Sequence, residues 1–217
     1  MKASTKHGMV ISLIWFLAVL PACTSTYKSS GFFDDYSVLQ EGEYLKQEYI
    51  APGADLYGYQ KVIVRSVEMK YFENAEGKFS QEDINKLSTR LHESLKEELG
   101  EKYVVLGETA PTDKNTLIVS PALVYVKTPN RLLNVATFWL IGFNFSKGAA
   151  AFEAKLIDGG SNKVVAEVAE KRKSAGGITD VKGILLGGWM RFASADGIFK
   201  RWGKDLVKLT TPPKKKQ

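Results

Sequence analysis

Cysteine and histidine are scarce in this chain. Of its 217 residues, one is a cysteine, Cys23, and two are histidines, His7 and His92. A single cysteine excludes an intrachain disulfide and a thiolate metal cluster, because both require more than one sulfur atom. We also expect no cofactor and no bound metal.

Acidic residues are missing from both ends of the chain. Residues 1–22 contain Lys2 and Lys6, and the last four residues contain Lys214, Lys215 and Lys216, without any Asp or Glu. Most of the net charge of +6 lies there, because the remainder holds 25 basic and 24 acidic residues. This distribution argues against nucleic acid as a partner. Residues 211–217 are expected to form a basic tail.

The N-terminal apolar run is too short to cross a bilayer. Residues 9–20 (MVISLIWFLAVL) are almost entirely apolar. A helix of this length extends about 18 Å, well short of the hydrocarbon core of about 30 Å. Preceded by two lysines, the run is typical of a secretory signal peptide, and we expect residues 1–22 to be removed.

The sequence Leu20-Pro21-Ala22-Cys23 resembles the lipobox of bacterial lipoproteins. The resemblance implies cleavage between Ala22 and Cys23, a diacylglycerol on the Cys23 sulfur and a further acyl chain, such as palmitate, on the new N-terminus. Several acyl chains would anchor the protein permanently, whereas one chain binds reversibly. Thr24 in place of Asp implies sorting to the outer membrane, with the domain facing the periplasm or, alternatively, the cell surface. Residues 23–30 would form a short lipidated tether.

Residues 31–210 are expected to form a single α/β domain. Strands are predicted where β-branched residues are frequent or where apolar and polar residues alternate, at residues 61–69, 103–106, 116–126, 148–158 and 163–171. An apolar stripe predicts a helix from the Ser80 N-cap to Gly100, with Asp83 completing a capping box. A second helix, interrupted at glycines, is expected between residues 181 and 206. Pro121 indicates a bulge or an edge position.

This order of elements predicts a two-layer sandwich. A strand–helix–strand start implies a parallel crossover, and the later hairpin adds antiparallel strands. We therefore expect one mixed sheet with both helices on one face. Residues 31–59 are rich in aromatic side chains without a clean period, and we expect irregular structure that packs on the domain. Stacking of these rings on envelope glycan is the alternative.

Two stretches resemble an uncharacterised family of bacterial lipoproteins that carries a domain of unknown function. Residues 31–39 (GFFDDYSVL) are similar to its GFLxDYSxL opening. Residues 148–158 (GAAAFEAKLID), followed by Val164-Val165-Ala166, are similar to its aalEaeltD hairpin. The resemblance covers nearly all of the mature chain and supports a lipoprotein, but it implies no reaction.

Four carboxylates are candidates for envelope hydrolase chemistry: Asp34, Asp35, Glu153 and Asp158. Glycosidases need two carboxyl groups about 5 to 9.5 Å apart, which neighbouring positions in sequence do not establish. His92 lies among Ser88, Glu93 and Ser94 on one helix, where neighbours point to different faces. We therefore expect no catalytic set.

Residues 132–145 (LLNVATFWLIGFNF) form the most distinctive internal apolar stretch. Three interpretations stay open: a buried element, a partner surface, or a segment that contacts the membrane. The residues proposed for an interaction surface are Leu132, Leu133, Phe138, Trp139 and Phe143.

The sequence as a whole indicates a non-enzymatic lipoprotein of the cell envelope. It would be held by acyl chains and would bind another envelope protein or peptidoglycan. The alternatives are a glycan or lipid hydrolase that uses carboxylates, and a structural subunit of an envelope complex.

Overall fold

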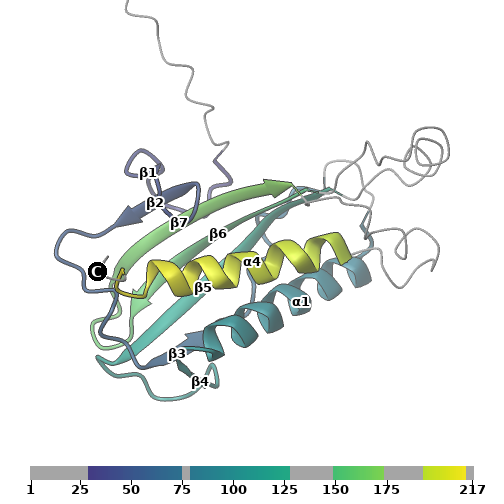
Figure 1. Ribbon diagram of the computed structural model, residues 1–217. Coiled ribbons are helices and arrows are strands. Elements are labelled where there is room, and N and C mark those ends of the chain that lie inside the picture. Colours follow the sequence, from purple (N-terminus) through teal and green to yellow (C-terminus); the bar gives the residue numbers. More distant parts are fainter. Residues whose placement is uncertain (1–28, 75–78, 128–148, 174–192, 214–217) are drawn as a thin grey trace, which may run out of the picture.

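The computed structural model describes residues 29–74, 79–127, 149–173 and 193–213. They form a seven-stranded open sheet in the order β1-β2-β7-β6-β5-β3-β4, with two helices side by side across one face (Figure 1). The predicted α/β two-layer sandwich is confirmed. The elements are β1 (Gln40–Glu41), β2 (Gln47–Ile50), β3 (Lys61–Val64), α1 (Gln81–Gly100), β4 (Val104–Leu106), β5 (Thr116–Lys127), β6 (Ala149–Asp158), β7 (Val164–Lys173) and α4 (Ala193–Leu209).

The sheet is mixed, as the order of elements predicted. Strand β3 pairs in parallel with β4 and with β5, and α1 is the crossover between them. Strands β5, β6 and β7 form an antiparallel meander at the centre, and β2 and β1 extend it to the other edge. Both the crossover and the hairpin at residues 158–164 were expected.

Helix α1 begins at the predicted cap. The Ser80 hydroxyl accepts the Asp83 N–H at 3.2 Å, and the Asp83 carboxylate accepts the Ser80 N–H at 3.2 Å. Two donors that lack partners inside the helix are satisfied in this way. The buried leucines at positions 87, 91, 95 and 99 face the sheet, and the helix ends at Gly100, as predicted.

The main core lies between the helices and the sheet. The Trp202 and Phe199 rings of α4 are fully buried, and Trp202 stacks on Phe152 of β6 with ring centroids 4.5 Å apart. Small residues on the sheet, including Ala154 and Ala166, leave room for these rings. Burying a large aromatic side chain stabilises the fold by about 2 to 3 kcal/mol.

Glycine does not interrupt the described part of the C-terminal helix, although an interruption had been expected. Gly197 and Gly203 both lie inside α4. A Cβ atom at position 203 would lie 2.6 Å from the Glu98 Cβ of α1. The glycine therefore lets the two helices approach closely, and this packing outweighs its low helix propensity. Residues 181–192, where the sequence predicts the first part of this helix, lie outside the described residues.

Pro121 occupies a central strand, so the predicted edge position was wrong. The carbonyl of Val119 accepts the Arg65 N–H, and the carbonyl of Pro121 accepts the Glu68 N–H. On the side of β5 that faces β3, the regular ladder stops where β3 ends at Val64, and the segment after β3 pairs with β5 again at Glu68. The missing proline N–H therefore faces a gap in the ladder, which explains why proline is tolerated. The predicted bulge occurs nearby, between Leu123 and Tyr125.

The segment 31–59 is more regular than predicted. It contains β1 and β2, and the residues of β2 pair with β7 from Gln47 opposite Ala169 to Ile50 opposite Ala166. The expectation of irregular structure throughout was wrong. Strand β2 lies near the edge of the sheet and is half-buried on both faces, so no alternation of polar and apolar residues marks it.

Candidate functional site

The face of the sheet opposite the helices is crossed by the first described residues of the domain. We call residues 30–39 the N-terminal strap and this side of the sheet the helix-free face. Phe32 and Phe33 are buried against Ala122 of β5 and Ala169 of β7, with their ring centroids 5.3 Å apart. Because the two alanine side chains are small, they leave room for the large phenylalanine rings to pack on the sheet.

The Tyr36 hydroxyl is the centre of the strap. It accepts the backbone N–H groups of Gly31, Phe32 and Phe33 at 3.1, 3.0 and 3.3 Å. Gly31 has a φ of 90°, which favours glycine because it lacks a Cβ. The hydroxyl in turn donates to Glu153 Oε2 at 2.8 Å. The backbone of the strap therefore folds around the Tyr36 hydroxyl oxygen, and this hydroxyl donates its own hydrogen bond to the sheet.

Glu153 is the buried acceptor for the strap. Its side chain rises from β6 beneath the aromatic rings, and the residue is 0% exposed. Oε2 also accepts the Ser30 hydroxyl at 2.7 Å, while Oε1 has no hydrogen-bond partner among the residues that the structure describes. Burying a carboxylate is unfavourable unless it is hydrogen-bonded, so these two donors provide its compensation.

A charged row lies beside the strap on the same face. Lys155 of β6 stands directly opposite Glu167 of β7. The Lys155 Nζ atom lies 3.7 Å from Asp34 Oδ2 and 5.2 Å from the centroid of the Phe32 ring. Burial raises the pKa of Glu167, and the negative charges of Asp34, Asp35 and Glu153 act in the same direction, whereas Lys155 opposes them. The row concentrates carboxylates around one lysine.

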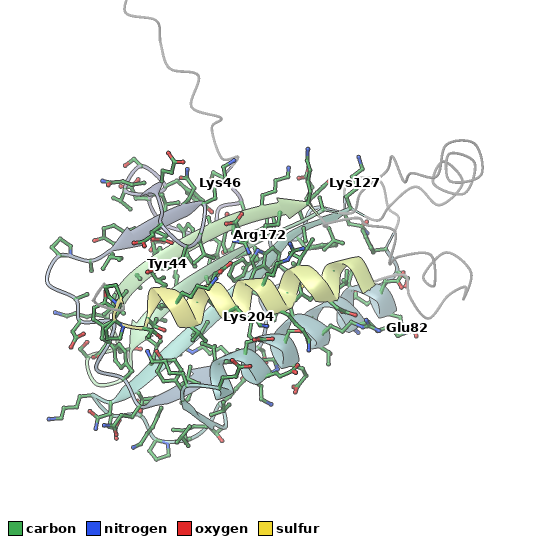
Figure 2. All side chains as sticks on the ribbon, in the orientation of Figure 1. Tyr44, Lys46, Glu82, Lys127, Arg172 and Lys204 are labelled. Atoms are coloured by element: carbon green, nitrogen blue, oxygen red, sulfur yellow. The ribbon has the colours of Figure 1, made fainter. Side chains whose placement is uncertain are left out.

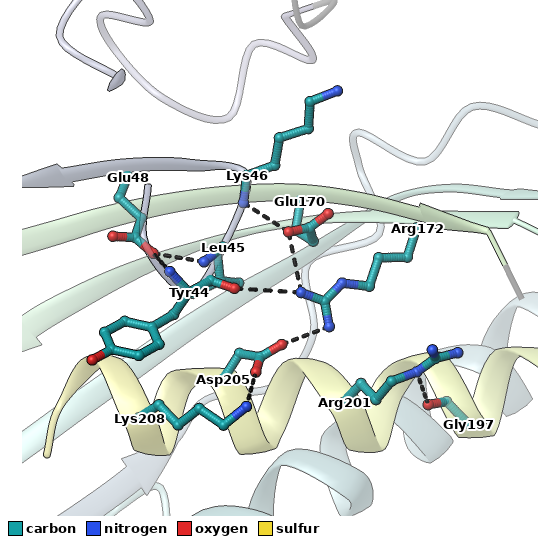
Figure 3. A network of polar contacts seen from close by, with 10 residues as sticks. All are labelled: Tyr44, Leu45, Lys46, Glu48, Glu170, Arg172, Gly197, Arg201, Asp205 and Lys208. Atoms are coloured by element: carbon teal, nitrogen blue, oxygen red, sulfur yellow. Dashed lines mark hydrogen bonds and ion pairs between the residues drawn. The ribbon is translucent and has the colours of Figure 1, made fainter. Parts of the chain in front are cut away.

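A second polar network joins the N-terminal segment to the helix side of the sheet (Figure 3). Arg172 of β7 donates to Asp205 of α4 at 2.5 Å, to Glu170 at 3.4 Å and to the Tyr44 carbonyl at 3.4 Å. Glu170 also accepts the Lys46 N–H at 2.7 Å. This network links the segment before β2, strand β7 and helix α4, and we assign it a structural role.

Three of the four carboxylates predicted from sequence, Asp34, Asp35 and Glu153, lie in or beneath the strap, whereas Asp158 lies apart from them. Glu153 is buried beneath the strap, and Asp34 is exposed at the strap surface. The Ser37 side chain and N–H lower the pKa of the exposed Asp35. Asp158 lies five residues beyond Glu153 on β6, about 17 Å along the strand, where hydrogen bonds from Ser161 lower its pKa.

His92 packs at the inner side of α1. Its Nε2 lies 3.1 Å from the Val64 carbonyl, which can only accept, so this nitrogen carries the proton. Glu108 and Glu93 lie 3.8 and 3.7 Å from the ring nitrogens. The histidine thus holds α1 against the end of β3.

Several predicted residues lie outside the described residues. They are Ala22, Cys23, Leu132, Leu133, Phe138, Trp139, Phe143 and the lysines of the basic tail. Strand β5 ends at Lys127 and β6 begins at Ala149, so residues 128–148 join the two strands at one end of the sheet. In the part of the chain that is described, no helix is long and apolar enough to cross a membrane, and no group of His, Cys, Asp and Glu side chains could hold a metal ion.

Sequence reasoning missed the contact between Tyr36 and Glu153. The tyrosine belongs to the GFFDDYSVL opening, and the glutamate belongs to the GAAAFEAKLID stretch. Both stretches carried the family resemblance, and the structure joins them through one hydrogen bond. The available signal was a lone glutamate among alanines on a strand, which indicates a buried carboxylate that needs a partner.

Comparison with solved structures finds several partial likenesses. A PelC dodecamer from Paraburkholderia phytofirmans has a TM-score of 0.40 and 12% identity, covering 76% of this chain and 98% of that chain. Protein XCC0632 from Xanthomonas campestris has a TM-score of 0.40 and 11% identity, covering 73% and 88%. The hypothetical protein CT253 from Chlamydia trachomatis has a TM-score of 0.39 and 15% identity, covering 70% and 95%.

No curated protein matches the sequence. A family described as "Protein of unknown function (DUF3313)" matches residues 28–206, which include the strap, the sheet and most of α4. The chain therefore belongs to the DUF3313 family.

Proposed function

We propose that this protein is a lipid-anchored lipoprotein of the bacterial outer membrane that acts by binding, without catalysis, on the periplasmic side. The main support is that residues 1–22 have the pattern of a signal peptide and are followed directly by Cys23, as in lipoprotein precursors. The partner would be another envelope protein or peptidoglycan.

The short tether between Cys23 and the first residue fixed to the sheet supports this proposal. Ser30 is hydrogen-bonded to Glu153, so the chain is fixed to the sheet only seven residues after Cys23. An extended chain of that length spans at most about 25 Å. An acylated Cys23 would therefore keep the whole domain close to the bilayer, where a binding module can meet other envelope components.

The surroundings of Glu153 favour binding over hydrolysis. A catalytic carboxylate must reach the substrate or a water molecule within hydrogen-bond distance. Glu153 is covered by the strap and already accepts two hydroxyl groups. Among the other carboxylates named above, Asp35 and Asp158 have lowered pKa values, which does not suit a general acid at neutral pH.

Intact-mass measurement of the membrane-extracted protein tests the anchor. The expected mass lacks residues 1–22 and carries three acyl chains, and Cys23→Ser should abolish both changes. Native protein that retains its leader, or that is cleaved without acylation, would overturn the proposal.

Crosslinking in intact cells tests the binding role. We expect recovery of a defined envelope protein or of peptidoglycan, and a Cys23→Ser control should lose it because the domain is no longer anchored. Recovery of no envelope component, combined with hydrolytic turnover of envelope glycan or lipid by the purified protein, would favour the hydrolase instead.

A further inference from the structure

Three lysines gather at one end of the helix-free face. The register of the central strands places Lys127 of β5 opposite Ala149 and Ala149 opposite Lys173 of β7. In the next row on the same face, Lys171 lies opposite Ala151. Figure 1 shows β5 and β7 ending at this side of the sheet, and Figure 2 labels Lys127 there. We call Lys127, Lys171 and Lys173 the lysine patch.

The lysine patch has the exposure and the spacing of a surface that binds several anions at once. All three side chains are exposed, and none forms an ion pair with an acid in the described ranges. Two strands across the sheet are about 10 Å apart, and successive residues on one face about 7 Å apart. The small Ala149 and Ala151 of β6 lie between the lysines, and Tyr125 of β5 is the large side chain in the row of Lys171.

Neighbouring aromatic and acidic groups define the margin of the lysine patch. The Lys171 ammonium lies 4.9 Å from the centroid of the Tyr125 ring, which holds it at the face of the sheet. Glu73, whose backbone pairs with that of Tyr125, brings one acid to the margin, and the exposed Asp34 and Asp35 of the strap lie farther along the same face. At the opposite end of the meander, by contrast, Lys114 and Lys163 accompany Asp113 and Asp158.

The tether reaches the sheet close to the lysine patch. Ser30 is bonded to Glu153, which lies two residues from Ala151 on β6, a separation of about 7 Å. An anchored Cys23 would therefore bring this part of the helix-free face to the bilayer together with the tether.

We propose that Lys127, Lys171 and Lys173 dock on the anionic phospholipid headgroups of the membrane that holds the anchor. The inference rests on the proposed lipid anchor, and it adds an orientation, with the lysine end of the helix-free face toward the membrane and both helices turned away. Each lysine near an anionic surface changes the docked population roughly fivefold. The tether would keep the domain near the membrane, and the lysine patch would determine which face of the domain is turned toward the membrane.

Amine labelling of the acylated full-length protein tests this orientation. The protein is reconstituted in vesicles of phosphatidylcholine, with or without phosphatidylglycerol, and each lysine is followed by mass spectrometry after treatment with a water-soluble acylating reagent. We expect Lys127, Lys171 and Lys173 to react at least about fivefold more slowly in anionic vesicles, because each lysine alone contributes about that factor, and high salt to remove the difference. Lys114 and Lys163 should react equally in both.

Matched variants separate docking from a general charge effect. Lys171→Gln combined with Lys173→Gln should abolish most of the protection of Lys127. Lys114→Gln combined with Lys163→Gln removes the same charge at the opposite end and should leave that protection intact.

The two kinds of failure are distinguishable. Equal labelling of the lysine patch in both vesicle types, or protection of Lys114 and Lys163 instead, would overturn the docking surface while the anchor stands. An intact mass without acyl chains would overturn the anchor and with it this inference.

Discussion

At the scale of single residues, the strap depends on one phenol oxygen. The Tyr36 hydroxyl satisfies three backbone donors and supplies one of the two hydrogen bonds to Glu153. The aromatic ring could be replaced by another apolar ring, but the hydroxyl has no substitute because the carboxylate beneath it is fully buried. Hydrogen bonds to buried charged groups are among the stronger ones in proteins.

Tyr36→Phe should therefore lower the free energy of unfolding by about 2 to 3 kcal/mol, because it removes a hydrogen bond to a buried carboxylate and leaves backbone donors unpaired. Urea denaturation measures the change. Tyr57→Phe is the matched control, since Tyr57 is 48% exposed and loss of its hydroxyl should alter stability by less than about 0.5 kcal/mol. A Tyr36→Phe protein as stable as the parent would show that the strap is held by its rings alone.

Glu167 gives the helix-free face a defined pH dependence. Its pKa is raised in the folded state above the ordinary value of 4.5, chiefly because burial disfavours the charged form. The folded protein then binds this proton more tightly than the unfolded chain, so this contribution to stability is present below pH 4.5 and is lost as the pH rises through the folded pKa.

Glu167→Gln should therefore make the protein more stable than the parent at about pH 7, and the difference should shrink as the pH falls toward about 4. Urea denaturation at a series of pH values measures this. A variant that is less stable than the parent at neutral pH would mean that attraction to Lys155 outweighs burial, contrary to this prediction.

At the scale of elements, the sequence was sufficient to predict a helix or strand where the residues that begin and end it are recognisable in the sequence. The Ser80 capping box, the leucine stripe and Gly100 define α1 within the sequence itself, and the structure agrees. The β6–β7 hairpin is similar, because alternation and the Asp158–Asn162 turn fix its register locally. Strands β1 and β2 were missed because they are short and half-exposed, and they become strands only by pairing with β7.

The two glycines of α4 show how tertiary contacts override helix propensity. Gly203→Ala should destabilise the protein by about 1 to 3 kcal/mol, because the added Cβ would press against Glu98 of the neighbouring helix. A Cβ at position 197 would meet no atom within 4 Å, so Gly197→Ala should stabilise the helix by about 1 kcal/mol. Thermal or urea unfolding measures both. Equal effects at the two sites would contradict the close approach of α1 and α4.

At the scale of the whole molecule, Arg172 joins three parts of the chain that are distant in sequence. It bonds to Glu170 on its own strand, to Asp205 on α4 and to the Tyr44 carbonyl before β2. Neither this network nor the contact of Tyr36 with Glu153 could be predicted from sequence. The contacts of Tyr36 with Glu153 and of Arg172 with Tyr44 join residues more than a hundred positions apart, and the contact of Arg172 with Asp205 joins a strand to a helix. Only the assembled fold determines these contacts.

Arg172→Gln should lower the free energy of unfolding by roughly 2 to 4 kcal/mol, because Glu170 would remain buried without its cation and Asp205 would keep only the exposed Lys208 as a partner. Lys200→Gln is the control, since its ion pair with Glu97 is exposed and should contribute less than about 1 kcal/mol. Urea denaturation compares the two. A similar small loss in both variants would show that the network adds little beyond packing.

The position of the strap also determines how the domain bears mechanical force. A pull on the chain ahead of residue 29 reaches the fold through Ser30 and Tyr36, whose hydroxyls both bond to β6. Strand β6 lies in the interior of the sheet, flanked by β5 and β7. The load is therefore shared by two long ladders instead of peeling an edge strand, and the first parts to yield would be two side-chain hydrogen bonds and a pair of phenylalanine rings.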